Sequence, residues 1–403
     1  MNTTFNKFSV SMLILMFALS GLNAQTTETV DGVKVVHNGK LGKWGKSPQV
    51  TLELVKTLGD IEADDENIAF YMPVDIAVDA EGNWYVLDSG NHRIQKFDAD
   101  GNYLDTFGGQ GQGPGEFAYP ASIDLDSKGY MYVSDPQNQR VQILDPDGNE
   151  YKTIRMTTEN IGDVRIFNSD QLIMGGSRGV MMMGMGDDEP KELPKLMKLM
   201  DTDGNISQRF GEQFNFKNQL VNRSGNQINF ALDNAGNVYV EFPYQNRIDK
   251  YSPDGKLLWK SDRALNFSMD PPKNKGKVER SGGNVSIRMP QMNRCSYGIA
   301  ADEKGRVWVV TLDRQLEEDE RVGMSMSVSM SGGQRSMNMK PQGNTEITET
   351  DALKLQVFDT DGFLLGEIPL ENFVDAIRIH KDRLFLIDRL RGTKFYEYKI
   401  IDK

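Results

Sequence analysis

Short runs of alternating apolar and polar residues recur along this chain, with turn-forming residues between them. The segment 73–108 holds four such runs, at 75–78, 84–88, 93–97 and 103–107. Runs of this length, rich in β-branched and aromatic residues, predict strands. Asp-x-x-Gly-Asn and Asp-x-Asp-Gly between them predict hairpin turns, because the Asp side chain bonds its own backbone and Gly takes the positive φ angle. The segment therefore predicts a four-stranded antiparallel sheet.

The same pattern returns along the rest of the chain. Eight positions of the first copy recur at one constant spacing in the second: Pro73, Asp79, Gly82, Asp88, Asn91, Arg93, Asp98 and Gly101 match Pro120, Asp126, Gly129, Asp135, Asn138, Arg140, Asp145 and Gly148. Six copies can be traced, four of them clear and two weak. One four-stranded sheet cannot bury both faces, so repeated copies must pack around an axis. The sequence predicts an all-β fold, a six-bladed β-propeller.

The two ends of the chain supply a check on this architecture. The last copy stops after its third strand, and a spare strand, Val50–Asp60, precedes the first copy. We expect this N-terminal strand to complete the last blade and close the ring, because closure removes an exposed sheet edge.

The repeat carries a family resemblance. The sequence PVDIAVDAEGNWYVLDSGNHRIQKFDADG, which starts at Pro73, resembles the NHL repeat, and the resemblance extends over nearly all of 70–400. It implies a six-bladed propeller of NHL type. NHL-type propellers include RNA-binding modules, protein-interaction modules and peptidyl-hydroxyglycine amidating lyases, and related folds include calcium-dependent lactonases. The chain also resembles exported six-bladed proteins of bacterial envelopes. The resemblance therefore indicates a fold more than a function.

The first 24 residues have the order of a secretory signal. Lys7 precedes an apolar stretch, Met12–Leu19, and small residues follow as far as Ala24. This order predicts cleavage and export to the periplasm or the outside, with no transmembrane segment in the mature protein. We accordingly divide the chain into a signal peptide (1–24), an N-terminal extension (25–49) and a propeller (50–403).

Composition excludes several classes of protein. The net charge is −12 and the pI about 5.0, which argues against a nucleic-acid partner, since such a surface needs surplus Lys and Arg. Cys295 is the single cysteine, so neither an intramolecular disulfide nor a Cys-based zinc site is expected. The amidating lyases use a histidine-bound zinc, but we expect His92 and His380 on opposite faces and His37 outside the propeller. No catalytic residues are assigned.

Every large insertion is predicted to lie on one face of the ring. With strands a to d counted outward, the b–c loops and the connections from d to the next a share an end. The insertions at about 178–192 and 313–350 fall in b–c loops, and those at about 261–296 and 108–117 in d-to-a connections. Binding residues collect in loops on a rigid scaffold. Neutral insertion into permissive loops is the alternative.

The start of each strand a is the first candidate site. These positions are expected to encircle the channel mouth on the same face: Asp75, Ser122, Asp163, Asn229, Gly298 and Asp375. Their oxygens suit a hard cation such as Ca²⁺, with Asp75, Asp163, Asn229 and Asp375 as the metal ligands, or the cationic group of a substrate. The alternative is that each side chain caps its own strand or binds channel water.

Two further patterns carry weaker hypotheses. An Asn-x-Arg element recurs in b–c loops at Arg93 and Arg140, and Arg247, directly preceded by Asn246, is counted with it. These arginines suit a carboxylate or sugar acid. The alternative is a structural pair with Asp88 or Asp135. Methionine-rich stretches at 179–189 and 323–340 suggest Cu(I) ligation, a pliable contact surface or low-complexity loops.

Together these patterns predict an exported binding or scaffold module with a protein, peptide or glycan partner. The alternative is a metal-dependent enzyme of the Ca-type lactonase or lyase kind at the channel mouth. No cofactor is expected apart from Ca²⁺ in that alternative.

Overall fold

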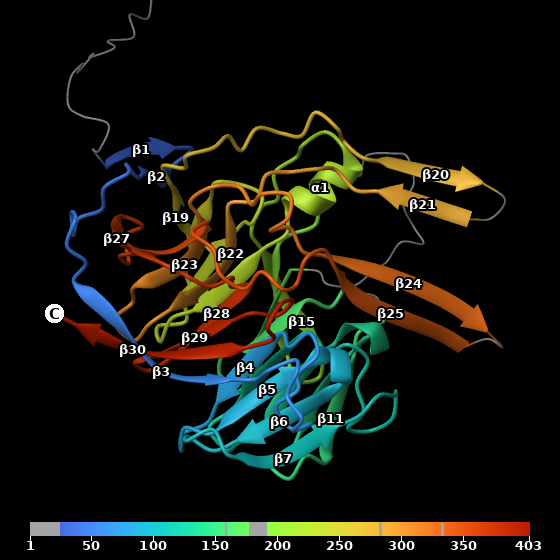
Figure 1. Cartoon of the computed structure of the whole chain (residues 1–403). Helices are drawn as coiled ribbons and strands as arrows, with labels where there is room; N and C mark the ends of the chain where they lie inside the picture. The colour runs from blue at the N-terminus through green and yellow to red at the C-terminus, as the bar shows by residue number, and fades with distance from the viewer. Residues whose placement is uncertain (1–24, 158, 177–191, 282–283, 332–333) are drawn as a thin grey trace, which may run out of the picture.

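The structure is a computed structural model that describes residues 25–157, 159–176, 192–281, 284–331 and 334–403. Six four-stranded antiparallel units are arranged around one axis, which confirms the predicted six-bladed β-propeller (Figure 1). Blade 1 holds β4 (Asp75–Val78), β5 (Trp84–Asp88), β6 (Arg93–Phe97) and β7 (Tyr103–Gly108), counted outward from the axis. These are the four runs that the alternation predicts.

The other blades repeat this order. Blade 2 holds β8 (Ser122–Leu125), β9 (Met131–Asp135), β10 (Arg140–Leu144) and β11 (Glu150–Arg155). Blade 3 holds β12 (Asp163–Ile166), β13 (Gln171–Gly175), β14 (Met197–Asp201) and β15 (Ile206–Phe210). Blade 4 holds β16 (Asn229–Leu232), β17 (Val238–Glu241), β18 (Ile248–Tyr251) and β19 (Leu257–Asp262). Blade 5 holds β22 (Ser296–Ala301), β23 (Val307–Leu312), β26 (Leu353–Phe358) and β27 (Leu364–Pro369).

Blade 6 is built from both ends of the chain. It holds β28 (Ala376–His380), β29 (Arg383–Ile387), β30 (Phe395–Asp402) and, as its outermost strand, β3 (Val50–Leu58). The register runs antiparallel from Val50 opposite Asp402 to Leu58 opposite Phe395. The expected closure of the ring by an N-terminal strand is therefore confirmed.

The N-terminal extension adds two strands that the repeat pattern does not predict. β1 (Thr26–Val30) and β2 (Val33–His37) form a hairpin, and β2 pairs in parallel with β19. Asn38 anchors it: its side chain donates to Ser261 Oγ (2.8 Å) and Gly362 O (3.0 Å) and accepts from Leu364 N (2.7 Å). The sheet of blade 4 therefore has six strands, and its outer edge is tied to blade 5.

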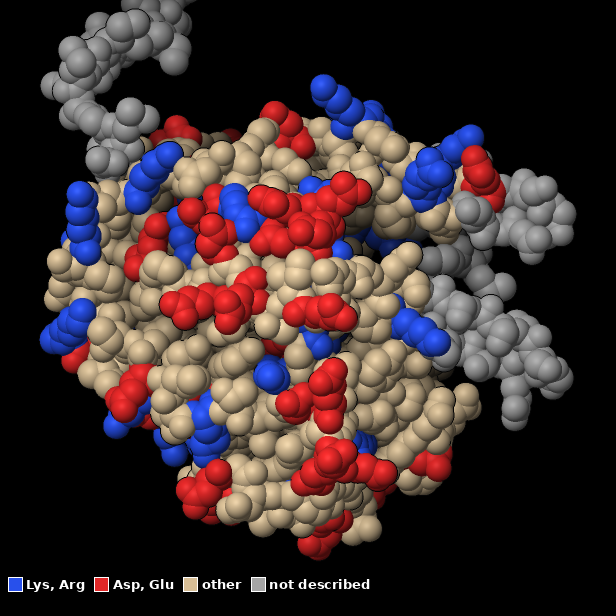
Figure 2. Space-filling view, in the orientation of Figure 1, with Lys and Arg blue, Asp and Glu red and all other residues tan. Residues whose placement is uncertain are grey.

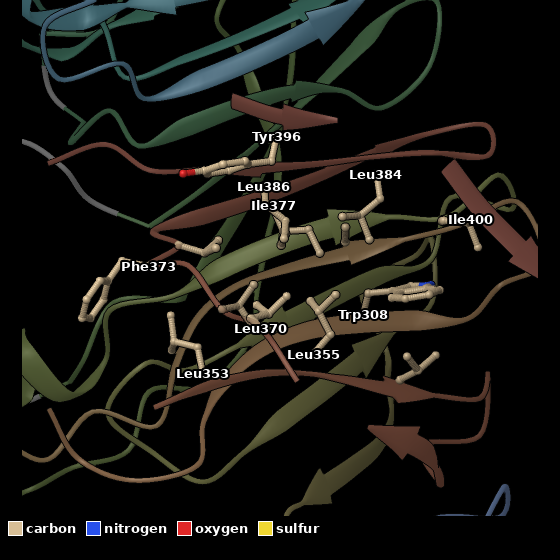
Figure 3. Close-up of a cluster of buried hydrophobic side chains, with 14 of the residues drawn as sticks. Trp308, Leu353, Leu355, Leu370, Phe373, Ile377, Leu384, Leu386, Tyr396 and Ile400 are labelled. Carbon is tan, nitrogen blue, oxygen red and sulfur yellow. The ribbon is translucent and has the colours of Figure 1, made fainter. Parts of the chain in front are cut away.

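The hydrophobic core is divided among the junctions between neighbouring blades. Each of six buried clusters joins one blade to the next. Figure 3 shows the junction of blades 5 and 6, where Trp308 and Leu355 face Leu384 and Leu386. Because apolar burial is the main favourable term in folding, adjacent blades stabilise one another. No blade is expected to be stable alone.

The tight turns at one end of the ring follow the predicted chemistry. Asp98 Oδ1 accepts from the backbone N–H groups of Asp100 (2.9 Å) and Asn102 (2.8 Å), and Gly101 has a φ of +91°. The same arrangement recurs at the Asp79, Asp126 and Asp302 turns. This end of the ring therefore consists of short, rigid turns.

The other end carries the elaborations, and we call it the insertion face. It holds helix α1 (Gln219–Gly225), the hairpin β20 (Lys277–Ser281) with β21 (Asn284–Arg288), and the hairpin β24 (Gly323–Ser331) with β25 (Gln334–Gln342). The 3₁₀ turns η1 (Ser89–Asn91) and η2 (Pro136–Asn138) lie in b–c loops. In Figure 1 both hairpins project from the right-hand end of the ring.

The second hairpin changes one sequence-based interpretation. The methionine-rich stretch 323–340 is not an irregular loop but a regular antiparallel ribbon from Gly323 opposite Gln342 to Ser331 opposite Gln334. The stretch 179–189 lies outside the described residues. Within the described part of the chain, no helix is long and apolar enough to cross a membrane.

Candidate functional site

The predicted mouth positions begin the innermost strand in four blades, at Asp75, Ser122, Asp163 and Asn229. Gly298 is instead the third residue of β22. The side chains at the mouth make their contacts within the fold. An innermost strand has no neighbour on the channel side, so its inward N–H groups need another partner. Asp75 Oδ2 accepts from Ile123 N (3.1 Å), and Ser122 Oγ accepts from Val164 N (2.8 Å). A side chain of one blade thus satisfies the backbone of the next. Asp75 Oδ1 also accepts from Ile76 N (3.0 Å), so Asp75 caps its own strand, as the alternative expected, in addition to bridging to the next blade.

Asp75 also forms the centre of a charge cluster. It is 1% exposed, and its two oxygens are bound by Arg165 Nη2 (2.8 Å) and Arg378 Nε (2.7 Å). The arginines come from blades 3 and 6, so this carboxylate ties three blades together across the channel. A cation at Asp75 would have to displace two guanidinium groups. The arrangement therefore argues against Ca²⁺ at this position.

The remaining mouth residues have partners of their own. Asn229 Nδ2 donates to the buried Glu241 (Oε2, 2.8 Å), and Asp375 Oδ2 accepts from Arg389 N (3.0 Å). Asp163 begins β12 and acts electrostatically on Arg165. Asp375 lies one residue before β28, so the weak alignment of the last copy misplaces it by one position. Among the described residues, no three His, Cys, Asp or Glu side chains gather as a metal site would require.

One carboxylate near this mouth titrates close to neutrality. Burial, and then the negative charge of Asp375, raise the pKa of Asp388 to about 6. Its oxygens accept from the N–H groups of Arg391 (3.0 Å) and Gly392 (2.7 Å). At 1% exposure, Asp388 cannot touch a substrate. We therefore treat Asp388 as a structural acid rather than a catalytic one.

The channel encloses a cavity of about 320 Å³ that is lined mainly by the innermost strands. Most of the residues that line it are apolar by type, and the exceptions are Asp124, Arg165, Arg378 and His380. Burial raises the pKa of Asp124, whose oxygens accept from Leu125 N (3.0 Å) and Ile166 N (2.8 Å). The sequence contained a signal for Asp124, Arg165 and Arg378, because each is a charge inside an otherwise apolar run. Each is the third residue of its innermost strand, whereas the predicted mouth comprises positions expected to start these strands.

The Asn-x-Arg arginines are held within the propeller. Arg93 Nε donates to Asp88 Oδ2 (2.8 Å), Arg140 Nε to Asp135 Oδ2 (3.0 Å), and Arg247 Nε to Asp249 Oδ1 (2.7 Å). The first two pairs are those of the structural alternative, whereas the repeat pattern does not predict the pairing of Arg247 with Asp249.

Arg140 shows what such an arginine does. It is 2% exposed, and it donates to the carbonyl oxygens of Gln112 (2.8 Å), Gly113 (3.0 Å) and Glu116 (2.6 Å). It therefore fixes the glycine-rich connection between blades 1 and 2. A guanidinium used in this way cannot also receive a carboxylate or a sugar acid from solvent.

The three histidines lie in different parts of the fold. His92 Nδ1 accepts from Tyr119 N (3.0 Å), and His37 Nδ1 contacts Asp262 Oδ2 (2.6 Å) at the edge of blade 4. His380 ends β28. They form no common site.

The base of the β24–β25 hairpin is clamped to the ring. Arg314 binds both oxygens of Glu320 (2.6 and 2.8 Å) and holds the pKa of that carboxyl down at about 2. Thr350 Oγ1 donates to Glu320 (3.0 Å), and Arg391 donates to the Glu320 carbonyl (2.5 Å). Tyr71 Oη donates to Met339 O (3.0 Å) on the hairpin itself. The hairpin therefore projects from a fixed root.

The surface carries both signs of charge. Figure 2 shows acidic side chains spread over the centre of the viewed face, with basic ones between them. This distribution agrees with the net charge of −12.

Comparison with known proteins supports the fold class. Residues 74–270 match the DUF5128 family model, described as a 6-bladed beta-propeller. That model is not the NHL repeat, so membership of the NHL family stays a prediction. No match is found among curated proteins.

Several solved structures are similar in fold. A member of the duf4221 family from Bacteroides vulgatus is 11% identical, with a TM-score of 0.53 over 88% of this chain and 99% of that one. A gluconolactonase from Xanthomonas campestris is 14% identical, with a TM-score of 0.47 over 87% and 100%. Virginiamycin B lyase from Staphylococcus aureus is 11% identical, with a TM-score of 0.44 over 87% and 100%. At these identities the likeness concerns the fold alone.

Proposed function

We propose that this protein is a binding or scaffold module that takes a protein, peptide or glycan partner on its insertion face. The observation that carries this proposal is the one-sided elaboration of the ring. Helix α1 and both projecting hairpins lie on the face of the b–c and d-to-a connections, whereas the other face consists of tight Asp-Gly turns. Loops on a rigid scaffold are the usual place for binding residues.

The clamped root of the β24–β25 hairpin supports the same function. A hairpin whose root is fixed by Arg314, Glu320 and Tyr71 has a defined attachment to the ring before a partner binds. Ordering costs free energy on association, so a fixed root favours binding.

The alternative is a Ca²⁺-dependent lactonase or lyase at the channel mouth. It requires free oxygen ligands near the axis, but both Asp75 oxygens are bound by arginines. Asn229 and Asp375 likewise bind protein groups. These contacts favour the binding function over the metal-dependent one.

Export belongs to the same proposal. Residues 1–24 lie outside the described part of the chain, and their sequence alone supports secretion. In the periplasm or outside the cell, the insertion face would meet its partner without passing a membrane.

Deletion of the hairpin tests the proposal. Gly323 and Gln342 pair directly, so a short glycine-serine linker can replace the residues between them. We expect chemical cross-linking in the exported fraction of the source cells to lose its main partner with this variant, at an unchanged melting temperature. Lys128→Glu, in a turn of the opposite face, is the matched control and should retain the partner. Capture that survives the hairpin deletion and fails with Lys128→Glu would place binding on the other face.

A further inference from the structure

The two projecting hairpins carry a charge opposite to that of the whole protein. We define arm 1 as residues 273–288 and arm 2 as residues 321–342. Together they contain one acidic residue, Glu279, and eight basic ones: Lys273, Lys275, Lys277, Arg280, Arg288, Arg321, Arg335 and Lys340. Glu279 pairs with Lys277 (2.9 Å). The chain as a whole has a net charge of −12, so positive charge is concentrated on the arms.

Arm 2 also has two chemically different faces. In a β-ribbon, residues two apart share a face, and directly paired residues lie on the same face. Methionines and Val328 alternate with serines along β24, and the register places Met326 opposite Met339 and Val328 opposite Met337. One face of the ribbon is therefore formed mainly by Met and Val positions, with Pro341 and, near the tip, Arg335 among them, and the other face by Ser, Asn and Lys positions. Met324, on the methionine face, is 42% exposed.

Arm 1 repeats this division on a smaller scale. Val278 pairs with Ile287, and Arg280 pairs with Val285, on one face. The other face holds the pairs of Lys277 with Arg288 and of Glu279 with Ser286. Both arms therefore combine an apolar face with basic residues.

No third strand of the described chain pairs with either arm. Each arm is a two-stranded sheet of its own. An isolated two-stranded hairpin is only marginally stable in water, and exposed apolar side chains such as Met324 mark a surface for interaction. Both arms project from the same end of the ring (Figure 1), so one extended surface can meet both.

We propose that the two arms dock the insertion face onto a lipid bilayer that contains anionic phospholipid. This inference goes beyond the proposed function, because a lipid surface is a partner in addition to the protein, peptide or glycan proposed above. Basic residues beside an apolar face are the combination that binds a charged membrane interface. Thioether side chains are flexible and fit an irregular apolar environment, which acyl chains provide. The open edges of each ribbon stay hydrogen bonded if the ribbon lies among headgroups and water.

The charge of the remaining propeller determines how the protein is oriented on the membrane. The body of the ring carries more negative charge than the whole chain and is repelled by the same membrane. Attraction at the arms and repulsion elsewhere allow one orientation, with the insertion face toward the lipid. Because the attraction acts between exposed charges, salt will weaken it.

Co-sedimentation of the mature chain with vesicles tests the proposal. We expect binding to vesicles of phosphatidylcholine with phosphatidylglycerol, and binding about tenfold weaker or less to phosphatidylcholine alone. The triple variant Lys273→Glu, Lys275→Glu, Lys340→Glu should lose about tenfold or more on the anionic vesicles. Its matched control changes three lysines of the opposite face to Glu: Lys128, Lys256 and Lys381. Equal binding to both vesicle types, or equal loss in variant and control, would overturn the proposal.

Substitutions on the methionine face test the apolar part without changing charge. Changing Met324, Met326 and Met337 to Leu should preserve vesicle binding, whereas changing them to Ser should weaken it at an unchanged melting temperature. Loss of binding with Leu would show that sulfur chemistry, rather than apolar contact, is required, and would refute the proposal. If vesicles fail to bind while cross-linking to a protein partner still depends on arm 2, the lipid proposal is wrong and the binding module stands.

Discussion

Replacing Asp75 by asparagine preserves the size of the side chain but removes the charge that Arg165 and Arg378 share. The two guanidinium groups would then lie close together without a counter-ion, with their side chains 12% and 25% exposed. The backbone contact to Ile123 N would remain available to the amide oxygen. The substitution therefore tests the charge cluster with little change in packing.

The expected effect is large. Removal of one partner from a buried ion pair typically costs about 3–5 kcal/mol. Unfolding entropy of roughly 2.1 cal/mol/K per residue, over roughly 350 residues, converts this loss into a fall of about 4–7 °C in the melting temperature. The usual free energy of unfolding is about 5–15 kcal/mol. The loss from this one substitution is a large share of it and should be easy to measure.

Calorimetry and denaturant titration of the mature chain provide the assay. Asp203→Asn is the matched control, because Asp203 pairs with Lys152 at 2.6 Å but is 72% exposed. An exposed pair contributes about 0–1 kcal/mol. Replacing Asp75, Arg165 and Arg378 together by apolar residues should recover much of the loss, because a buried ion pair often contributes little net stability relative to well-packed apolar residues.

Two results would refute this reasoning. One is an Asp75→Asn variant that loses no more stability than Asp203→Asn. The other is a wild-type protein whose melting temperature rises with millimolar Ca²⁺ while that of Asp75→Asn does not. The second result would restore the cation site at the channel mouth.

Three further predictions concern other parts of the ring. Arg140→Ala should cost about 3–5 kcal/mol and speed amide exchange in 110–117, whereas equal exchange would show that other contacts hold this loop. Since the folded pKa of Asp388 is about 6 and an unfolded Asp titrates near about 3.9, its contribution to stability is full in acid and is lost as the pH rises through about 6. Asp388→Asn should flatten this part of the denaturation profile, and an unchanged slope would contradict the assignment. Deletion of residues 25–38 should uncover the edge of β19 and cause self-association on gel filtration, whereas a monomeric variant would show that this edge needs no cover.

Much of the fold could be predicted because its signals are local. Alternation of period two and Asp-Gly turns define each strand within a few residues, and counting strands was enough to find the closing strand Val50–Leu58. The β24–β25 hairpin also has a local signal, an alternation of period two. Methionine and serine alternate in 323–331, which is a strand pattern, but its low complexity suggested a loop.

The contacts at the mouth could not be predicted, because they join distant parts of the chain. Arg165 and Arg378 lie in the two weakly aligned copies, and no repeat position specifies that both turn toward Asp75. The parallel pairing of β2 with β19 has no periodic signal either. Register within a blade follows from sequence, whereas side-chain pairing between blades depends on the angle between the sheets.

The pairing of β3 with β30 has a consequence for biosynthesis. Its two strands lie far apart along the chain, so the ring stays open until β30 has left the ribosome. A nascent or prematurely terminated polypeptide would lack β30. Both of its neighbours, β29 and β3, would then have an unpaired edge. β30 thus decides whether the ring can close, and products truncated before it should be open to degradation while those that contain it are not.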